Sequence, residues 1–118
     1  MTLEAKKVVS RCLHLTNINL KIESGNDIIG SSEPYIVGRI GGWSARTEVV
    51  EGKAVTFKKG LELKYSEETE LKLEVWEEDL NDDDKLYTEV IKLSDLTEES
   101  GDMKIPFKEE KDGKKRQG

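Results

Sequence analysis

Hydrophobic and polar residues alternate with a period of two along most of this chain. Leu61, Leu63 and Tyr65, for example, are separated by charged residues. Seven runs show this alternation or are rich in strand-forming residues: 8–15, 34–40, 45–50, 61–65, 71–76, 87–93 and 103–107. Because successive side chains of a β-strand point to opposite faces, the period indicates strands with one buried face. No window keeps a 3.6-residue period over three turns, although residues 94–100 are compatible with one helical turn.

Turn-forming residues separate these runs and indicate how the strands are connected. Gly, Asn and Asp lie between most of them, which predicts an all-β fold, an antiparallel β-sandwich of seven to eight strands. Gly41 and Gly42 predict a tight turn between two runs, with Trp43 beside it as a candidate contact residue. The chain has 118 residues, which suits one domain over residues 1–109. Residues 110–118 are charged and are expected to form a disordered tail.

Composition and charge narrow the function. Charged residues make up 37% of the chain and the formal net charge is -6, which argues against nucleic acid as a partner. No stretch approaches the roughly 20 apolar residues of a membrane span, and the first residues lack the apolar segment of a signal peptide. Cys12 is the single cysteine, so no internal disulfide forms. These features predict a cytoplasmic protein, which we expect to be a monomer.

Acidic residues concentrate in two predicted loops. Residues 77–87, EEDLNDDDKLY, contain six carboxylates directly after a strand-like run, and Asp27 and Glu33 flank a Gly-Ser-Ser segment before the run at 34–40. Neighbouring carboxylates repel one another. Calcium binds six to eight oxygen ligands, many of them carboxylates on flexible loops, and would relieve that repulsion. The two loops are therefore either solvated acidic surface or the two halves of a cation site.

An EF-hand loop is one way to bind calcium, and this sequence does not fit it. Asp79, Asn81 and Asp83 match the first three ligand positions. Asp84 stands where the loop requires Gly, and Val90 stands where it requires a bidentate Glu. The flanking segments are also predicted strands, whereas an EF-hand needs helices.

The order of strands and acidic loops resembles the C2 domain, the calcium-dependent membrane-binding module of protein kinase C and the synaptotagmins. The family's first-loop pattern is Asp-x-x-Gly-x-Ser-Asp-Pro-Tyr, and residues 27–35 read Asp-Ile-Ile-Gly-Ser-Ser-Glu-Pro-Tyr. Its third-loop pattern is an apolar strand, Asp-x-Asp and a later Asp. Here Val-Trp-Glu-Glu-Asp at 75–79 is followed by Asp84. Residues 85–96, KLYTEVIKLSDL, resemble the family's next strand and its closing Leu-Ser-x-Leu. The resemblance covers about residues 8–96.

The resemblance implies a C2-like Greek-key sandwich with calcium as the cofactor and an anionic phospholipid membrane as the partner of the calcium-bound state. The implied ligands are Asp27, Glu33, Glu77, Asp79 and Asp84, with Asp82 and Asp83 as further candidates. Apolar residues at the loop tips would enter the membrane or else pack beneath the loops: Ile28, Ile29 and Leu80. Glu33 and Glu77 replace the Asp that the family prefers, and the longer side chain still reaches a metal.

Two other functions stay open on this scaffold. One is a calcium-insensitive domain that binds a protein partner, and the other is a calcium buffer with no lipid step. An enzyme is not expected, because no nucleophile elbow, Gly-rich phosphate loop or catalytic Cys-His pairing is recognised in the sequence. His14 is the single histidine, so a transition-metal site is not expected either.

Overall fold

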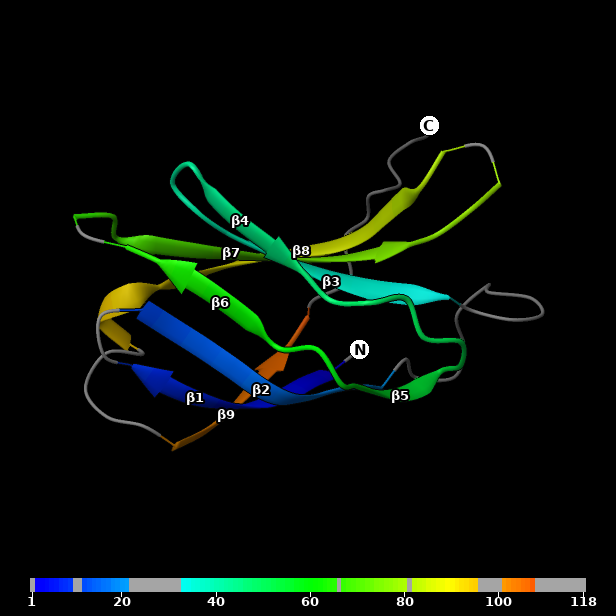
Figure 1. Ribbon diagram of the computed structural model, residues 1–118, viewed down its shortest axis with the longest axis horizontal. Helices are drawn as coiled ribbons and strands as arrows, with labels where there is room; N and C mark the ends of the chain where they lie inside the picture. Colours follow the sequence, from blue (N-terminus) through cyan, green and yellow to red (C-terminus); the bar gives the residue numbers. More distant parts are fainter. Residues whose placement is uncertain are drawn as a thin grey trace.

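Nine β-strands in two packed sheets make up most of the computed structural model (Figure 1). The structure describes residues 2–9, 12–21, 33–65, 67–80, 82–95 and 101–107, without the side chains of residues 8 and 9. The strands are β1 (Thr2–Val9), β2 (Cys12–Lys21), β3 (Pro34–Ile40), β4 (Trp43–Arg46), β5 (Ala54–Phe57), β6 (Leu61–Lys64), β7 (Glu70–Glu77), β8 (Asp84–Lys92) and β9 (Gly101–Pro106). One short 3₁₀ helix, η1 (Leu93–Asp95), follows β8. No described helix has the length and apolar character needed to cross a membrane.

All strand pairs are antiparallel, and the two sheets lie as two layers in Figure 1. In the first sheet β2 pairs with both β5 and β6, β1 pairs with β2, and β9 pairs with β1. The second sheet has the order β4-β3-β7-β8. The predicted antiparallel sandwich is therefore confirmed.

The strand count exceeds the predicted seven to eight because one strand is interrupted. β5 pairs with residues 18–21 of β2 and β6 pairs with residues 12–15, so the two are halves of one broken strand and the sandwich has eight strand positions. At the junction between these two halves, β2 contains a β-bulge. Two of its residues lie opposite the single residue Ala5 of β1, between the pairs Glu4–Asn19 and Lys6–Thr16. Asn17, in this bulge, has a φ of 50°, a left-handed conformation that Asn tolerates better than most residues.

The core lies between the two sheets, and many of its residues are those that alternation predicted to point inward. Its fully buried members include Leu61, Leu63, Leu71, Leu73 and Val75. From β9 and the residue after it, Met103, Ile105 and Phe107 close one side. Burial of these side chains provides the main driving force for folding.

Two sequence predictions about strand limits are wrong. Residues 8–15 are not one strand, because β1 ends at Val9 and β2 begins at Cys12. The chain reverses there without a Gly, Pro or Asn to signal a turn, and β1 starts much earlier than its sequence pattern suggested. The run at 45–50 is mostly loop, since β4 spans Trp43–Arg46. The helical turn predicted at 94–100 is represented by η1, and residues 96–100 lie outside the described residues.

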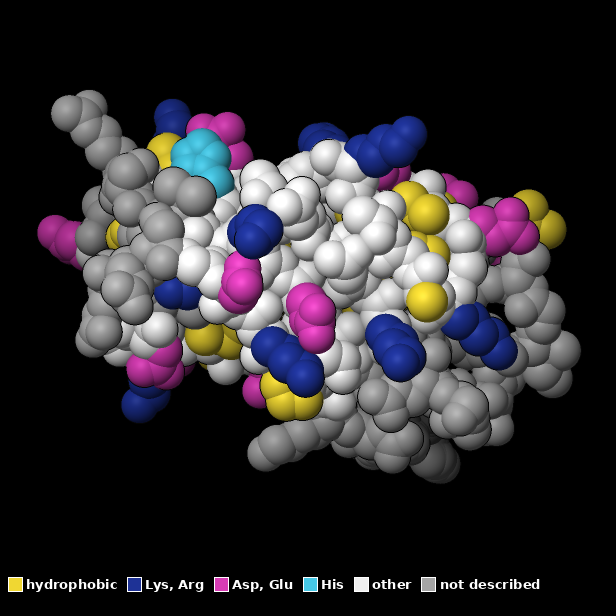
Figure 2. All heavy atoms as spheres, turned by 90° about the horizontal axis from the view of Figure 1, so that it is seen from below, with side chains coloured by type: hydrophobic (Ala, Val, Ile, Leu, Met, Phe, Trp, Pro, Cys, Tyr) yellow, Lys and Arg dark blue, Asp and Glu magenta, His cyan; other side chains and the backbone are white. Residues whose placement is uncertain are grey.

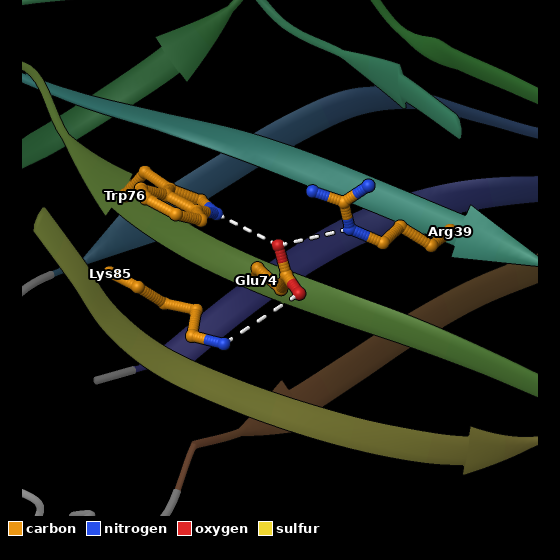
Figure 3. A network of polar contacts seen from close by, with 4 residues as sticks. All are labelled: Arg39, Glu74, Trp76 and Lys85. Atoms are coloured by element: carbon orange, nitrogen blue, oxygen red, sulfur yellow. Dashed lines mark hydrogen bonds and ion pairs between the residues drawn. The ribbon is translucent and has the colours of Figure 1, made fainter. Parts of the chain in front are cut away.

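The outer face of the second sheet holds a buried carboxylate. Glu74 is only 3% exposed. Its Oε1 accepts hydrogen bonds from Arg39 Nε at 3.3 Å and from Trp76 Nε1 at 2.8 Å, and Lys85 Nζ lies 4.0 Å from Oε2 (Figure 3). A buried charge is tolerated when it is paired and hydrogen-bonded, as here. Because Arg39, Glu74 and Lys85 belong to β3, β7 and β8, this cluster ties three adjacent strands together.

A glycine at the break between β5 and β6 provides a test of the sheet geometry. A Cβ atom at Gly60 would lie 2.3 Å from the backbone oxygen of Leu15, whereas one at Gly42 would meet nothing within 4 Å. We expect Gly60→Ala to lower the free energy of unfolding by about 1–3 kcal/mol, the usual effect of overpacking. Gly42→Ala should stay within about 0.5 kcal/mol of the wild type. Urea denaturation measures the free energy of unfolding of both variants. Equal stabilities of the two variants would contradict the close approach of Gly60 to the backbone of β2.

Candidate metal centre

Strand register brings three acidic segments to one end of the second sheet. Glu77, at the end of β7, pairs with Pro34 at the start of β3 and with Asp84 at the start of β8. The backbone N–H of Glu78 donates a hydrogen bond of 3.1 Å to the carbonyl oxygen of Glu33. In Figure 1 the start of β3 and the connection from β7 to β8 lie on the same side of the view.

These segments surround a hollow of about 540 Å³. Six carboxylate residues line it, and we call them the acidic rim: Glu33, Glu77, Glu78, Asp79, Asp83 and Asp84. Leu80 is the other lining residue. The donors are therefore all oxygen atoms of the kind that hard cations prefer.

The rim carries largely uncompensated negative charge. Burial raises the pKa of Glu77, and the nearby carboxylates of Asp84, Asp79 and Glu33 raise that pKa further, against a backbone hydrogen bond at Glu33 that lowers it. Within the described residues, no Lys or Arg forms an ion pair with a rim carboxylate. The carboxylates of the rim thus repel one another, and a bound cation would relieve that repulsion.

Asp83 differs from Asp79, whose Oδ1 accepts a hydrogen bond from the Leu80 backbone N–H, because both of its carboxylate oxygens have partners. Its Oδ2 accepts a hydrogen bond of 2.5 Å from the Tyr35 hydroxyl, and its Oδ1 accepts one of 3.3 Å from the Asp79 backbone N–H. The Tyr35 hydrogen bond is the main cause of the lowered pKa of Asp83. Burial, followed by this hydrogen bond, raises the pKa of Tyr35 to about 12. Asp83 therefore holds the loop in place.

Sequence reasoning missed this support for the loop. Tyr35 belongs to the Pro-Tyr pair of the first-loop pattern, yet no role followed from the pattern itself. The Arg46 guanidinium lies 4.0 Å from the centre of the Tyr35 ring, and the Tyr35 and Trp76 rings stack with their centres 6.4 Å apart. Only the pairing of β3 with β4 and β7 could have placed these side chains together. Among the six rim residues, Glu78 is the one that the sequence analysis did not name as a candidate ligand.

The structure brings together four of the five implied ligands. Glu33, Glu77, Asp79 and Asp84 all line the hollow, whereas the exposed Asp82 does not. Leu80 is 99% exposed, so it does not pack beneath the loop. The remaining predictions, Asp27, Ile28 and Ile29, lie outside the described residues.

The rim carboxylates lie near one another, but their oxygen atoms are too far apart to coordinate one ion together in this arrangement. Within the described part of the chain, no three of them have oxygens within 4.8 Å of one another. Calcium ligands lie about 2.3–2.6 Å from the ion, so binding requires these side chains to rotate inward. Asp79 and Asp84 are exposed and free of core packing, which permits such rotation.

Comparison with known proteins identifies the fold. No family model matches the chain, and a search of curated proteins finds no match either. Among solved structures, the crystal structure of a RIM C2 domain from Drosophila, the domain designated A, is similar, with a TM-score of 0.63 and 14% sequence identity. The match covers 89% of this chain and 97% of that chain. The resemblance predicted from the two acidic loops is therefore confirmed at the level of the fold, and the chain is a C2-like β-sandwich domain.

Proposed function

We propose that the acidic rim binds calcium and that the calcium-bound domain attaches to anionic phospholipid membranes. The observation that carries this proposal is the hollow lined by six carboxylates, without a described basic partner, and by the exposed Leu80. The residues that would hold the ions are Glu33, Glu77, Asp79 and Asp84, joined by Asp27 from the first loop. Calcium would supply the positive charge that the rim lacks.

Charge controls attachment in this proposal. Without calcium, the rim and the net charge of -6 repel the negative surface of an anionic leaflet. Bound ions neutralise the rim and bridge its carboxylates to lipid phosphates. Leu80 then enters the interface, where full burial of a leucine is worth roughly 1.5–3 kcal/mol. This switch needs little change in the fold, because the strands that position the rim stay paired.

A calcium-insensitive protein-interaction domain is the second candidate function. Trp43 is 51% exposed at the turn between β3 and β4, which lies at the other end of β3 from the rim. Lys64 Nζ lies 5.2 Å from the centre of its ring. An exposed aromatic residue beside a cation is a suitable contact anchor. A calcium buffer without lipid binding is the third candidate, and the experiments below separate all three.

The first prediction concerns stability in calcium. A ligand that binds only the folded state stabilises it by about 2.7 kcal/mol at one hundred times its dissociation constant. For a small domain, this raises the melting temperature by on the order of 10 °C. Magnesium should have a smaller effect, because it demands a tighter octahedral site. Thermal melts in calcium, in magnesium and in chelator, at matched ionic strength, measure the shift.

Two double variants test whether the calcium-dependent shift in melting temperature arises from the rim. Asp79→Asn with Asp84→Asn should abolish the calcium shift and leave the calcium-free protein no less stable. Asp95→Asn with Asp102→Asn makes the same change in net charge at exposed positions outside the rim, and should retain the shift. A wild-type melting temperature unaffected by calcium would favour the protein-interaction function.

The second prediction uses the raised pKa of Glu77. A group whose pKa is higher in the folded state contributes stability below its ordinary pKa, near 4.5, and loses that contribution as the pH rises through the folded value. At pH 7 without calcium, Glu77→Gln should therefore be more stable than the wild type, by on the order of 0.5 kcal/mol. Below about pH 4.5 the advantage should disappear.

Calcium should reverse this order, since Glu77→Gln removes a ligand. Urea denaturation at several pH values, with and without calcium, measures both effects. Glu33→Gln is a comparison within the rim, and a surface variant such as Glu70→Gln is the control. A Glu77→Gln protein less stable than the wild type at neutral pH without calcium would show that the Glu77 charge is favourable.

The third prediction concerns Leu80 and lipid. Leu80→Ser should weaken calcium-dependent binding to phosphatidylserine vesicles by about tenfold, because roughly 1.4 kcal/mol of apolar burial is lost. Calcium binding without lipid should persist. Val90→Ser is the matched control, since Val90 is a half-exposed apolar residue of β8 away from the rim. Vesicle co-sedimentation and calcium calorimetry measure the two activities, and calcium binding with no vesicle binding by the wild type would indicate the buffer.

A further inference from the structure

The outer face of the first sheet carries a second group of potential metal ligands. Cys12 and His14 lie two residues apart on β2, so their side chains point to the same face. Glu62 on β6 pairs directly with His14 and is diagonal to Cys12. Directly paired residues have Cβ atoms about 4.5–5.5 Å apart, and diagonal neighbours remain within reach of long side chains.

The ligand atoms of these three side chains converge. The Cys12 sulfur, a ring nitrogen of His14 and a carboxylate oxygen of Glu62 all lie within 4.8 Å of one another. Zinc bonds to sulfur at about 2.3 Å and to nitrogen or oxygen at about 2.0–2.2 Å, which separates tetrahedral ligand atoms by roughly 3.5 Å. The ligand atoms must therefore approach one another by about 1 Å to bind zinc. The exposed Glu62 side chain is free to make this movement.

The surroundings leave this group open to a metal. The side chains of His14 and Glu62 are 39% and 64% exposed, and Figure 2 shows the one histidine at the surface of this face with an acidic side chain beside it. His14 Nε2 lies 4.0 Å from Glu62 Oε2, too far for a hydrogen bond. Lys64 pairs with Cys12, but its ammonium lies over the Trp43 ring. Among the described residues, no packed side chain has to move for a metal to enter from solvent.

We propose that Cys12, His14 and Glu62 form a zinc site, with the fourth tetrahedral position open to water or to a ligand from another molecule. A thiolate, an imidazole and a carboxylate form a donor set that suits zinc and is too soft for calcium. This site lies on the other sheet from the acidic rim. It departs from the sequence-based expectation that the single histidine makes a transition-metal site unexpected. The proposal does not rest on calcium binding.

Cobalt(II) provides a direct test, because a thiolate ligand gives cobalt a charge-transfer absorption band. The chain has one cysteine and one histidine, so such a band reports Cys12 alone. The reduced full chain is titrated with cobalt in excess calcium, which competes with cobalt for the carboxylates of the acidic rim, and zinc is then added. We expect the band to appear at one metal per chain and to disappear when zinc displaces cobalt. We also expect sedimentation to show that the protein remains monomeric.

Variants then distinguish the three-ligand site from a reactive thiol. Cys12→Ser should remove the band, and His14→Ala or Glu62→Gln should each weaken zinc binding by at least about tenfold, the loss seen even for outer-shell partners. Glu4→Gln is the matched control, an exposed carboxylate of β1 on the same sheet, and should bind zinc like the wild type. Thermal melts without metal confirm that each variant folds.

Three results would overturn the proposal. One is the absence of the thiolate band in the wild type. Another is zinc affinity that His14→Ala and Glu62→Gln leave unchanged, which would make Cys12 the only protein ligand. The third is one metal for two chains with a metal-dependent dimer, which would mean that two cysteines share the ion.

Discussion

The pairing register of β3, β7 and β8 decides which side chains meet at the acidic end of the domain. Glu77 pairs with Pro34 on one side and with Asp84 on the other, so the rim exists only in this register. A slip by one residue would exchange the two faces of β7 and bury the wrong residues. Two features prevent it: Ile36 and Val75 pair across the core side, and Glu74 binds Arg39 and Lys85 on the outer side.

Two of the three glutamates of strand β7, Glu74 and Glu77, have opposite environments. Glu74 is buried and has two cationic partners and an indole N–H, so its charge is balanced inside the protein. Three residues later, Glu77 is surrounded by other carboxylates, and its pKa is raised. Arg46 lies over the Tyr35 ring, and its charge helps to lower the pKa of one rim residue, Asp83. The charge of Glu74 is thus balanced within the sheet, whereas the carboxylates around Glu77 have no ion-paired Lys or Arg among the described residues.

The period-two pattern predicted the sandwich and most of its core, because inward positions such as Leu61, Leu63, Met103 and Ile105 follow from local alternation alone. β1 was not recognised, since it buries only Leu3 and Ala5 among the residues whose side chains are described. The resemblance to the C2 domain pointed to Glu33, Glu77, Asp79 and Asp84, which line one hollow because they lie at or next to the ends of β3, β7 and β8. What spacing could not supply was cross-strand contact. The Tyr35–Asp83 hydrogen bond and the approach of Glu62 to Cys12 and His14 each join segments far apart in the sequence.

Ligand chemistry keeps the two candidate metal sites distinct. The acidic rim offers only oxygen donors, from strand ends and the loop between them, which suit a large, hard ion with many ligands. The β2–β6 group offers sulfur and nitrogen from paired strands, where positions are fixed and few ligands can reach one ion. The sheet group therefore offers calcium too few oxygen atoms to compete with the rim. Zinc binds carboxylates as well, but a thiolate and an imidazole held two residues apart on one strand give it a better donor set. On the two proposals made above, the same sandwich would respond to two metals independently, because its acidic rim and its sheet face present different atoms.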